Sequence, residues 1–171
     1  TEDIINHLWE DRPSLPKTPV FILDETRTGA SCTEKIGRIQ ESIAKNGASA
    51  IILSALDEIA WTLNLCGEDA HCNPVFISYL LITKKDYTLY ILEEKITDEV
   101  RTYLKKHQVT TKPYSALAEN LRTFDSKREG VLQISPLANE ALYDLSTRYT
   151  ETIVAPSPVA LMKAVKNETE Q

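Results

Sequence analysis

A short apolar run constrains the fold of this chain more than any other feature. Residues 50–53 read Ala-Ile-Ile-Leu, without a polar interruption. A strand with one face in water alternates apolar and polar residues, whereas a strand buried on both faces, as in a parallel sheet, is apolar throughout. The run therefore predicts a central strand that helices cover on both sides.

Strand and helix patterns alternate from Val20 onward. Further strands are predicted over 20–23, 75–83, 87–92, 109–112, 131–134 and 152–155. Helices are predicted over 31–46, 56–63, 97–107 and 115–124, and from Ser135 through Leu145. Three of these helices begin with a capping signal: the Ser31 and Glu34 pair, Thr97, and Ser135 followed by a proline.

The turn at residues 84–86 joins two β-rich runs and so predicts one antiparallel hairpin within the sheet. Alternating strands and helices otherwise favour parallel pairing through helical crossovers. We therefore expect an α/β fold, with a mixed, mostly parallel sheet and helices on both faces. Residues 20–158 are expected to form this domain.

Residues 1–19 are predicted to be a linker arm that joins the domain to other polypeptide. An apolar turn over residues 4–9 is followed by Pro13, Pro16 and Pro19, which prevent a continuous helix. The chain does not start with methionine, and it stops within a polar, helix-forming run. We expect that it is part of a longer protein.

Charge and composition exclude several classes of function. The net charge is -6 and the pI is near 5.1, whereas phosphate binding needs a basic face, so no nucleic-acid partner is expected. No apolar run reaches the roughly 20 residues of a membrane span, and no signal peptide is recognisable. Three cysteines without a framework spacing indicate reduced thiols, and hence a soluble cytoplasmic protein.

No motif of catalysis stands out in the chain. The five glycines are scattered, so neither a dinucleotide nor a P-loop fingerprint can be written. Residues 66–72 gather two thiols, an imidazole and two carboxylates, but without the spacing of a zinc site. Asp57 and Glu58 are interpreted as favourable charges in a first helical turn, and Trp61 as core packing. We expect no catalytic residue and no metal ligand here.

Several motifs resemble one family closely. One stretch resembles the second domain of three-domain, eukaryotic-type aminopeptidase P: the run Ala55-Leu56-Asp57-Glu58-Ile59-Ala60-Trp61-Thr62-Leu63-Asn64-Leu65, then Gly67, Asp69 and Asn73-Pro74-Val75-Phe76 with Ser78-Tyr79. Leu8-Trp9 with Asp11-Arg12-Pro13 is similar to the linker that enters that domain. Residues 163–167 are similar to the junction with the catalytic domain, so 159–171 are expected to begin that junction.

The resemblance implies an accessory creatinase-like domain of an Xaa-Pro aminopeptidase. Such enzymes remove the N-terminal residue from peptides whose second residue is proline, with two divalent metal ions, usually manganese, in a C-terminal domain. The implied partners are the N-terminal and catalytic domains of the parent and proline-containing peptides; a homodimeric parent is left open. Relatives commonly carry arginine where this chain has Cys66, which puts a charged contact there in doubt.

One loop is the implied point of contact with substrate. The resemblance places the loop over residues 64–74, called here the 64–74 loop, towards the substrate entrance, and its polar composition predicts an exposed segment. Its candidate residues are Asn64, Gly67, Glu68, Asp69, His71 and Asn73. Glu68 and Asp69 are expected to attract the cationic N-terminus of a peptide. A catalytically dead, aminopeptidase-like module that binds peptides or histones is the alternative function.

Overall fold

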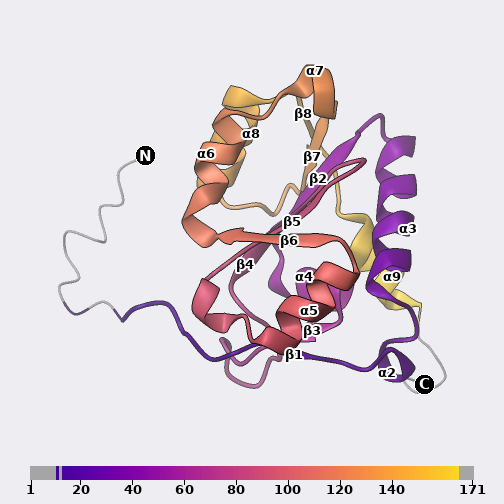
Figure 1. Cartoon of the computed structure of the whole chain (residues 1–171). Helices are drawn as coiled ribbons and strands as arrows, with labels where there is room; N and C mark the ends of the chain where they lie inside the picture. Colours follow the sequence, from indigo (N-terminus) through magenta and orange to yellow (C-terminus); the bar gives the residue numbers. More distant parts are fainter. Residues whose placement is uncertain (1–10, 12, 166–171) are drawn as a thin grey trace.

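A six-stranded mixed sheet forms the centre of the computed structural model, which describes residues 11 and 13–165 (Figure 1). Its strand order is β6-β5-β4-β2-β7-β8. The bounds are β2 Ala50–Leu53, β4 Ser78–Ile82, β5 Tyr87–Ile91, β6 Val109–Pro113, β7 Leu132–Ile134 and β8 Thr152–Val154. β2 pairs in parallel with β7, as do β7 with β8 and β5 with β6, whereas β4 is antiparallel to both neighbours. The predicted mixed, mostly parallel sheet is confirmed.

Helices cover both faces of this sheet, as the central run predicts. One face packs against α3 (Cys32–Lys45), α4 (Leu56–Leu63), α5 (Asp98–Lys106) and α9 (Pro158–Ala164) (Figure 1). The other face packs against α6 (Leu117–Arg122) and α8 (Glu140–Tyr149). All four residues of β2 are buried, with Ile51 and Leu53 in the first core and Ala50 and Ile52 in the second.

Capping side chains set the helix starts where the sequence signals them. Ser31 and Glu34 form the predicted capping box at the start of α3, and Thr97 Oγ1 accepts the Val100 N–H at the start of α5. Such caps typically contribute about 1 kcal/mol each. Three α-helices of the described residues were not predicted: α2 (Glu25–Thr28), α7 (Ser126–Glu129) and α9.

Two predicted elements are wrong in part. The helix expected from Ser135 begins only at Glu140, because Ser135 closes a turn through its hydroxyl and its carbonyl, while Asn139 caps α8. The segment expected as one helix over 115–124 is divided into the 3-10 helix η2 (Tyr114–Ala116) and α6. In both places a polar side chain or a tight turn competes with a regular helix.

The first predicted strand lies outside the main sheet. β1 (Phe21–Ile22) pairs antiparallel with β3 (Leu65–Cys66), and together they form a separate two-stranded sheet. The 64–74 segment, predicted to be a loop, therefore contains a short strand. This small sheet holds the start of the domain against the end of α4.

The ends of the described chain are attached to the domain. Residues 13–19 run along its surface to Val20, which is fully buried (Figure 1). At the other end, Val159 of α9 belongs to the first core, so α9 packs as part of the folded unit. The apolar turn predicted over residues 4–9 lies outside the described residues. Among the described helices, none has the length and apolar character to cross a membrane.

Candidate functional site

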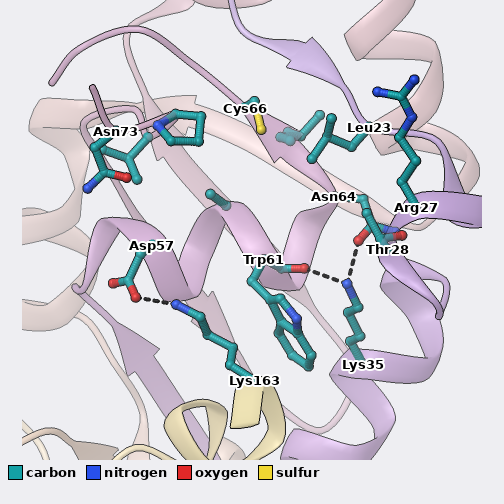
Figure 2. A pocket seen from close by; sticks show the side chains of 14 residues that line it. Leu23, Arg27, Thr28, Lys35, Asp57, Trp61, Asn64, Cys66, Asn73 and Lys163 are labelled. Atoms are coloured by element: carbon teal, nitrogen blue, oxygen red, sulfur yellow. Dashed lines mark hydrogen bonds and ion pairs between the residues drawn. The ribbon is translucent and has the colours of Figure 1, made fainter. Parts of the chain in front are cut away.

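A cleft of about 340 Å³ lies where α2, β3, α4 and α9 meet, and we call it the α4 cleft (Figure 2). Apolar side chains form much of its wall, and several charged groups stand around them. Its lining residues are Leu23, Arg27, Thr28, Lys35, Asp57, Ala60, Trp61, Asn64, Leu65, Cys66, Asn73, Pro74, Val75 and Lys163. The cleft thus combines residues of the 64–74 loop with residues of the C-terminal helix.

A buried lysine organises one side of the cleft. Lys35 is fully buried, and its Nζ donates to the Trp61 carbonyl at 2.8 Å and to Asn64 Oδ1 at 2.6 Å (Figure 2). The ammonium also lies 4.2 Å from the centre of the Trp61 ring, within the range of a cation–π interaction. These contacts compensate for the loss of water around the charge.

Asn64 ends α4 in a left-handed conformation, with φ at 53°. Its side chain accepts from Lys35 and donates to the Ala30 carbonyl at 3.0 Å, and its own carbonyl accepts the Leu23 N–H at 2.8 Å. Asparagine tolerates this backbone conformation better than most residues. The residue is only 1% exposed, so the expected solvent-facing position of Asn64 is wrong: it joins α4 to the segments before α3.

Two neighbouring carboxylates at the start of α4 lie in different environments. Asp57 forms an ion pair with Lys163 of α9, and this hydrogen bond lowers the pKa of Asp57 (Figure 2). Glu58 is only 9% exposed, and burial raises its pKa although Ser157 hydrogen-bonds to it. The helix-dipole interpretation of this pair is therefore incomplete, because Asp57 also joins two helices.

Gly67 is a close-packed point of the 64–74 loop. A Cβ built on it would lie 2.7 Å from the Cβ of Phe76 and 3.0 Å from the Val75 carbonyl oxygen. Phe76 is fully buried. Only glycine fits here without displacing its neighbours, so Gly67 lies inside the domain and the expected exposure of this residue is also wrong.

Asp69 differs most from its predicted role. Its side chain is fully buried and forms an ion pair with Lys95, with 2.5 Å between Oδ1 and Nζ. The second carboxylate oxygen accepts the Ile77 N–H at 2.7 Å. The expectation that Asp69 attracts a peptide's N-terminus from solvent is wrong, because both oxygens are engaged within the domain.

The remaining three candidates of the 64–74 loop lie on the surface. Glu68, His71 and Asn73 are exposed, and Asn73 lines the α4 cleft (Figure 2). The Asn73 N–H donates to the Ala70 carbonyl at 3.2 Å, which makes a turn at the tip of the loop. The structure therefore separates the six predicted residues into a buried group, Asn64, Gly67 and Asp69, and an exposed group.

The three cysteines are unpaired in the structure. Cys32 and Cys66 are buried, and burial raises the pKa of Cys66 and brings that of Cys32 to about 12. Both are therefore protonated and unreactive at neutral pH. Within residues 11 and 13–165, no three His, Cys, Asp or Glu side chains gather as metal ligands would.

Sequence reasoning missed the two lysines that hold this region together. Lys35 lies on the apolar stripe of α3, where Cys32, Ile36 and Ile39 are all buried. A lysine at such a position signals a buried partner, since charged side chains are rarely buried alone. Lys95 carries no comparable signal, because it belongs to the short 3-10 helix η1 (Glu93–Lys95) between a strand and a helix.

The chain is similar to a known domain family and to named relatives. Residues 11–170 match the family described as "Creatinase/Prolidase N-terminal domain". A "Probable Xaa-Pro aminopeptidase P" of Sordaria macrospora is 37% identical over 99% of this chain and 29% of its own length. The "Xaa-Pro aminopeptidase 1" of Dictyostelium discoideum is 38% identical over 94% of this chain and 25% of its own length. The chain thus spans little more than a quarter of these relatives.

Solved structures show the same fold. The X-prolyl aminopeptidase of Caenorhabditis elegans, described as a cytosolic enzyme with a di-nuclear active site, superposes with a TM-score of 0.87 at 26% identity. The match covers 98% of this chain and 28% of that one. The N-terminal domain of the peptidase PepQ from Mycobacterium tuberculosis has a TM-score of 0.54 at 16% identity, over 75% of this chain and 98% of that one, and shares the fold.

Proposed function

The chain belongs to the creatinase/prolidase N-terminal domain family, and we propose that it is a non-catalytic domain of a metallopeptidase that removes the N-terminal residue from peptides with proline in second position. The observation that carries this proposal is the similarity of nearly the whole chain to relatives named Xaa-Pro aminopeptidase. The chain matches about a quarter of the length of these relatives. The cytosolic enzyme of C. elegans supports a cytosolic parent.

The side chains of the chain fit an accessory role. Cleavage by a metallopeptidase requires a metal site that activates water. Asp57, which lines the α4 cleft, is paired with Lys163, and Asp69, the buried carboxylate of the 64–74 loop, is paired with Lys95. The described residues also contain no cluster of three potential ligands. We therefore assign two divalent ions, which we propose to be manganese, to polypeptide of the parent outside this chain; the di-nuclear site of the C. elegans enzyme supports that number.

The C-terminal helix offers a surface for another domain of the parent. Leu161 of α9 is 79% exposed and Val165, the residue that follows the helix, is 80% exposed, while Val159 and Met162 pack against the core. Contiguous exposed apolar surface marks sites where another protein or domain packs. We propose that this surface of α9 packs against the catalytic domain.

The proposed function is tested by comparing this chain with the parent enzyme. Purified chain and full-length parent are incubated with an Xaa-Pro-Xaa tripeptide and manganese, and release of the N-terminal residue is measured. We expect turnover by the parent and none by the chain. Metal-dependent turnover by the chain would contradict the accessory role, and an inactive, metal-free parent would favour the interaction module.

We propose that the exposed tip of the 64–74 loop borders the route of the substrate in the parent. Glu68 is its exposed carboxylate, and an exposed charge contributes at most about 1 kcal/mol to attracting a cationic N-terminus. In the parent, Glu68→Ala is expected to raise KM up to about fivefold at low salt with kcat nearly unchanged, because the attraction is equal in the ground and transition states. Glu41→Ala, an exposed carboxylate on α3, is the control. Equal kinetics of both variants would contradict this role of the loop.

A further inference from the structure

The ion pair between Asp69 and Lys95 is completely removed from solvent, since both side chains are 0% exposed. Burying two charges costs free energy that their attraction alone often does not repay, so a buried pair is weak evidence for stability. Such pairs are better explained where they fix one arrangement of the chain among several. The contacts around this pair show which segments it could fix.

Asp69 holds the 64–74 loop and the strand that follows it. Its Oδ2 accepts the Ile77 N–H at 2.7 Å, immediately before β4. Its own N–H donates to the Val75 carbonyl at 3.1 Å. The residue therefore ties the two ends of the loop tip together and fixes them to the sheet.

Lys95 holds the arm. Its Nζ donates to the Thr18 carbonyl at 3.1 Å, and its carbonyl accepts the Val20 N–H at 3.0 Å. The neighbouring pair of Lys17 and Glu94, at 3.0 Å, is exposed on both sides and contributes little. The buried pair thus joins the arm to the 64–74 loop through two side chains.

We propose that Asp69 and Lys95 are positioning residues through which the arm fixes the 64–74 loop. A displacement of the polypeptide that precedes the domain would move the Thr18 carbonyl, and hence Lys95, Asp69 and the loop tip. The role of this coupling in the parent rests on the proposed function. There the coupling would make the loop beside the substrate route respond to the part of the parent that precedes the domain. The coupling itself is a property of this chain.

The test measures amide hydrogen exchange in the chain, with and without residues 1–18. Among the described residues, this truncation removes the Thr18 carbonyl, to which Lys95 Nζ donates, and the exposed pair of Lys17 and Glu94. We expect exchange of the Asp69 amide to accelerate about tenfold, the change expected for losing one hydrogen bond to a charged group. In the Lys95→Met background the same truncation should change it less than twofold. Lys17→Ala, which breaks only the exposed pair, should leave the Asp69 amide unchanged.

Two results would overturn the proposal. In the first, removal of residues 1–18 leaves the Asp69 amide protected from exchange. In the second, the removal accelerates exchange of this amide equally in the unchanged chain and in Lys95→Met. If Lys95→Met does not fold, Asp69→Asn replaces it, and exchange of the Val75 amide is followed as the reporter. Because exchange is measured without substrate, failure here leaves the proposed function untouched, and an inactive parent leaves the coupling untouched.

Discussion

Replacing Gly67 by alanine tests the packing on which the 64–74 loop depends. The new Cβ would lie 2.7 Å from the Cβ of Phe76, closer than two such carbons approach in proteins. Phe76 cannot easily move, because it is fully buried and the N–H of the next residue, Ile77, is held by Asp69. The strain must therefore be taken up by the backbone of the loop.

The expected loss follows from this overlap. Adding a methyl group to a close-packed site costs about 1–3 kcal/mol. For a chain of 171 residues, a loss of about 2 kcal/mol lowers Tm by about 4–8 °C. Urea unfolding followed by far-UV circular dichroism should give a lower midpoint with an unchanged m value, which indicates a stability change without a change in the surface exposed.

Gly37→Ala is the matched control, since it is the same substitution at a site with free space. Gly37 lies inside α3, and a Cβ there would meet nothing within 4 Å. Alanine is a better helix former than glycine, so this variant should gain about 0.5–1 kcal/mol. Opposite signs for the two variants are expected. A Gly67→Ala chain as stable as the unchanged protein would refute the close packing of the loop.

Two buried groups make stability depend on pH in opposite directions. Burial raises the pKa of Glu58 above its usual 4.5, so the stability that this residue contributes is fully present below pH 4.5 and is lost as pH rises through its folded-state pKa. Glu58→Gln should therefore raise the free energy of unfolding at pH 7 and leave it unchanged near pH 3. A less stable variant at pH 7 would contradict this. For His107, burial and then Lys106 lower the pKa below 6.5, so stability is present above that pH and is lost as pH falls through the folded-state pKa. His107→Gln should flatten urea-derived stability between pH 7 and 5, and an unchanged slope there would exclude His107 as its source.

Local rules predicted most of the fold because the relevant interactions are close in sequence. Three confirmed predictions depend on residues within a few positions of one another: the capping box at Ser31, the N-cap at Thr97 and the buried strand over 50–53. The helix expected at Ser135 failed where a turn and a nearby asparagine offered competing hydrogen bonds. In that segment, sequence alone could not rank two satisfactory local arrangements.

The candidate site was harder to predict, because its organising contacts are distant in sequence. Asp69 and Lys95 lie 26 positions apart, and Lys35 and Asn64 lie 29 positions apart. A polar loop composition indicates exposure only when no buried partner is available. Here Lys35 and Lys95 supply that partner for Asn64 and Asp69. Gly67 is buried as well, by close packing against Phe76, so half of the six predicted loop residues lie inside the domain.

The antiparallel β4 beside the central β2 has a consequence for the order in which the sheet assembles. β4 and β5 form a hairpin across a short turn, and β2 can join it before β7 does, since the segment between β2 and β4 is shorter than the segment between β2 and β7. The other edge of β2 must wait for β7, because Ala50 pairs with Leu132. Until then a wholly apolar strand has an unpaired edge, the kind of surface on which nascent chains associate. Synthesis that stops before residue 132, or refolding that stalls before β7 pairs with β2, would therefore leave this domain prone to aggregation rather than merely incomplete.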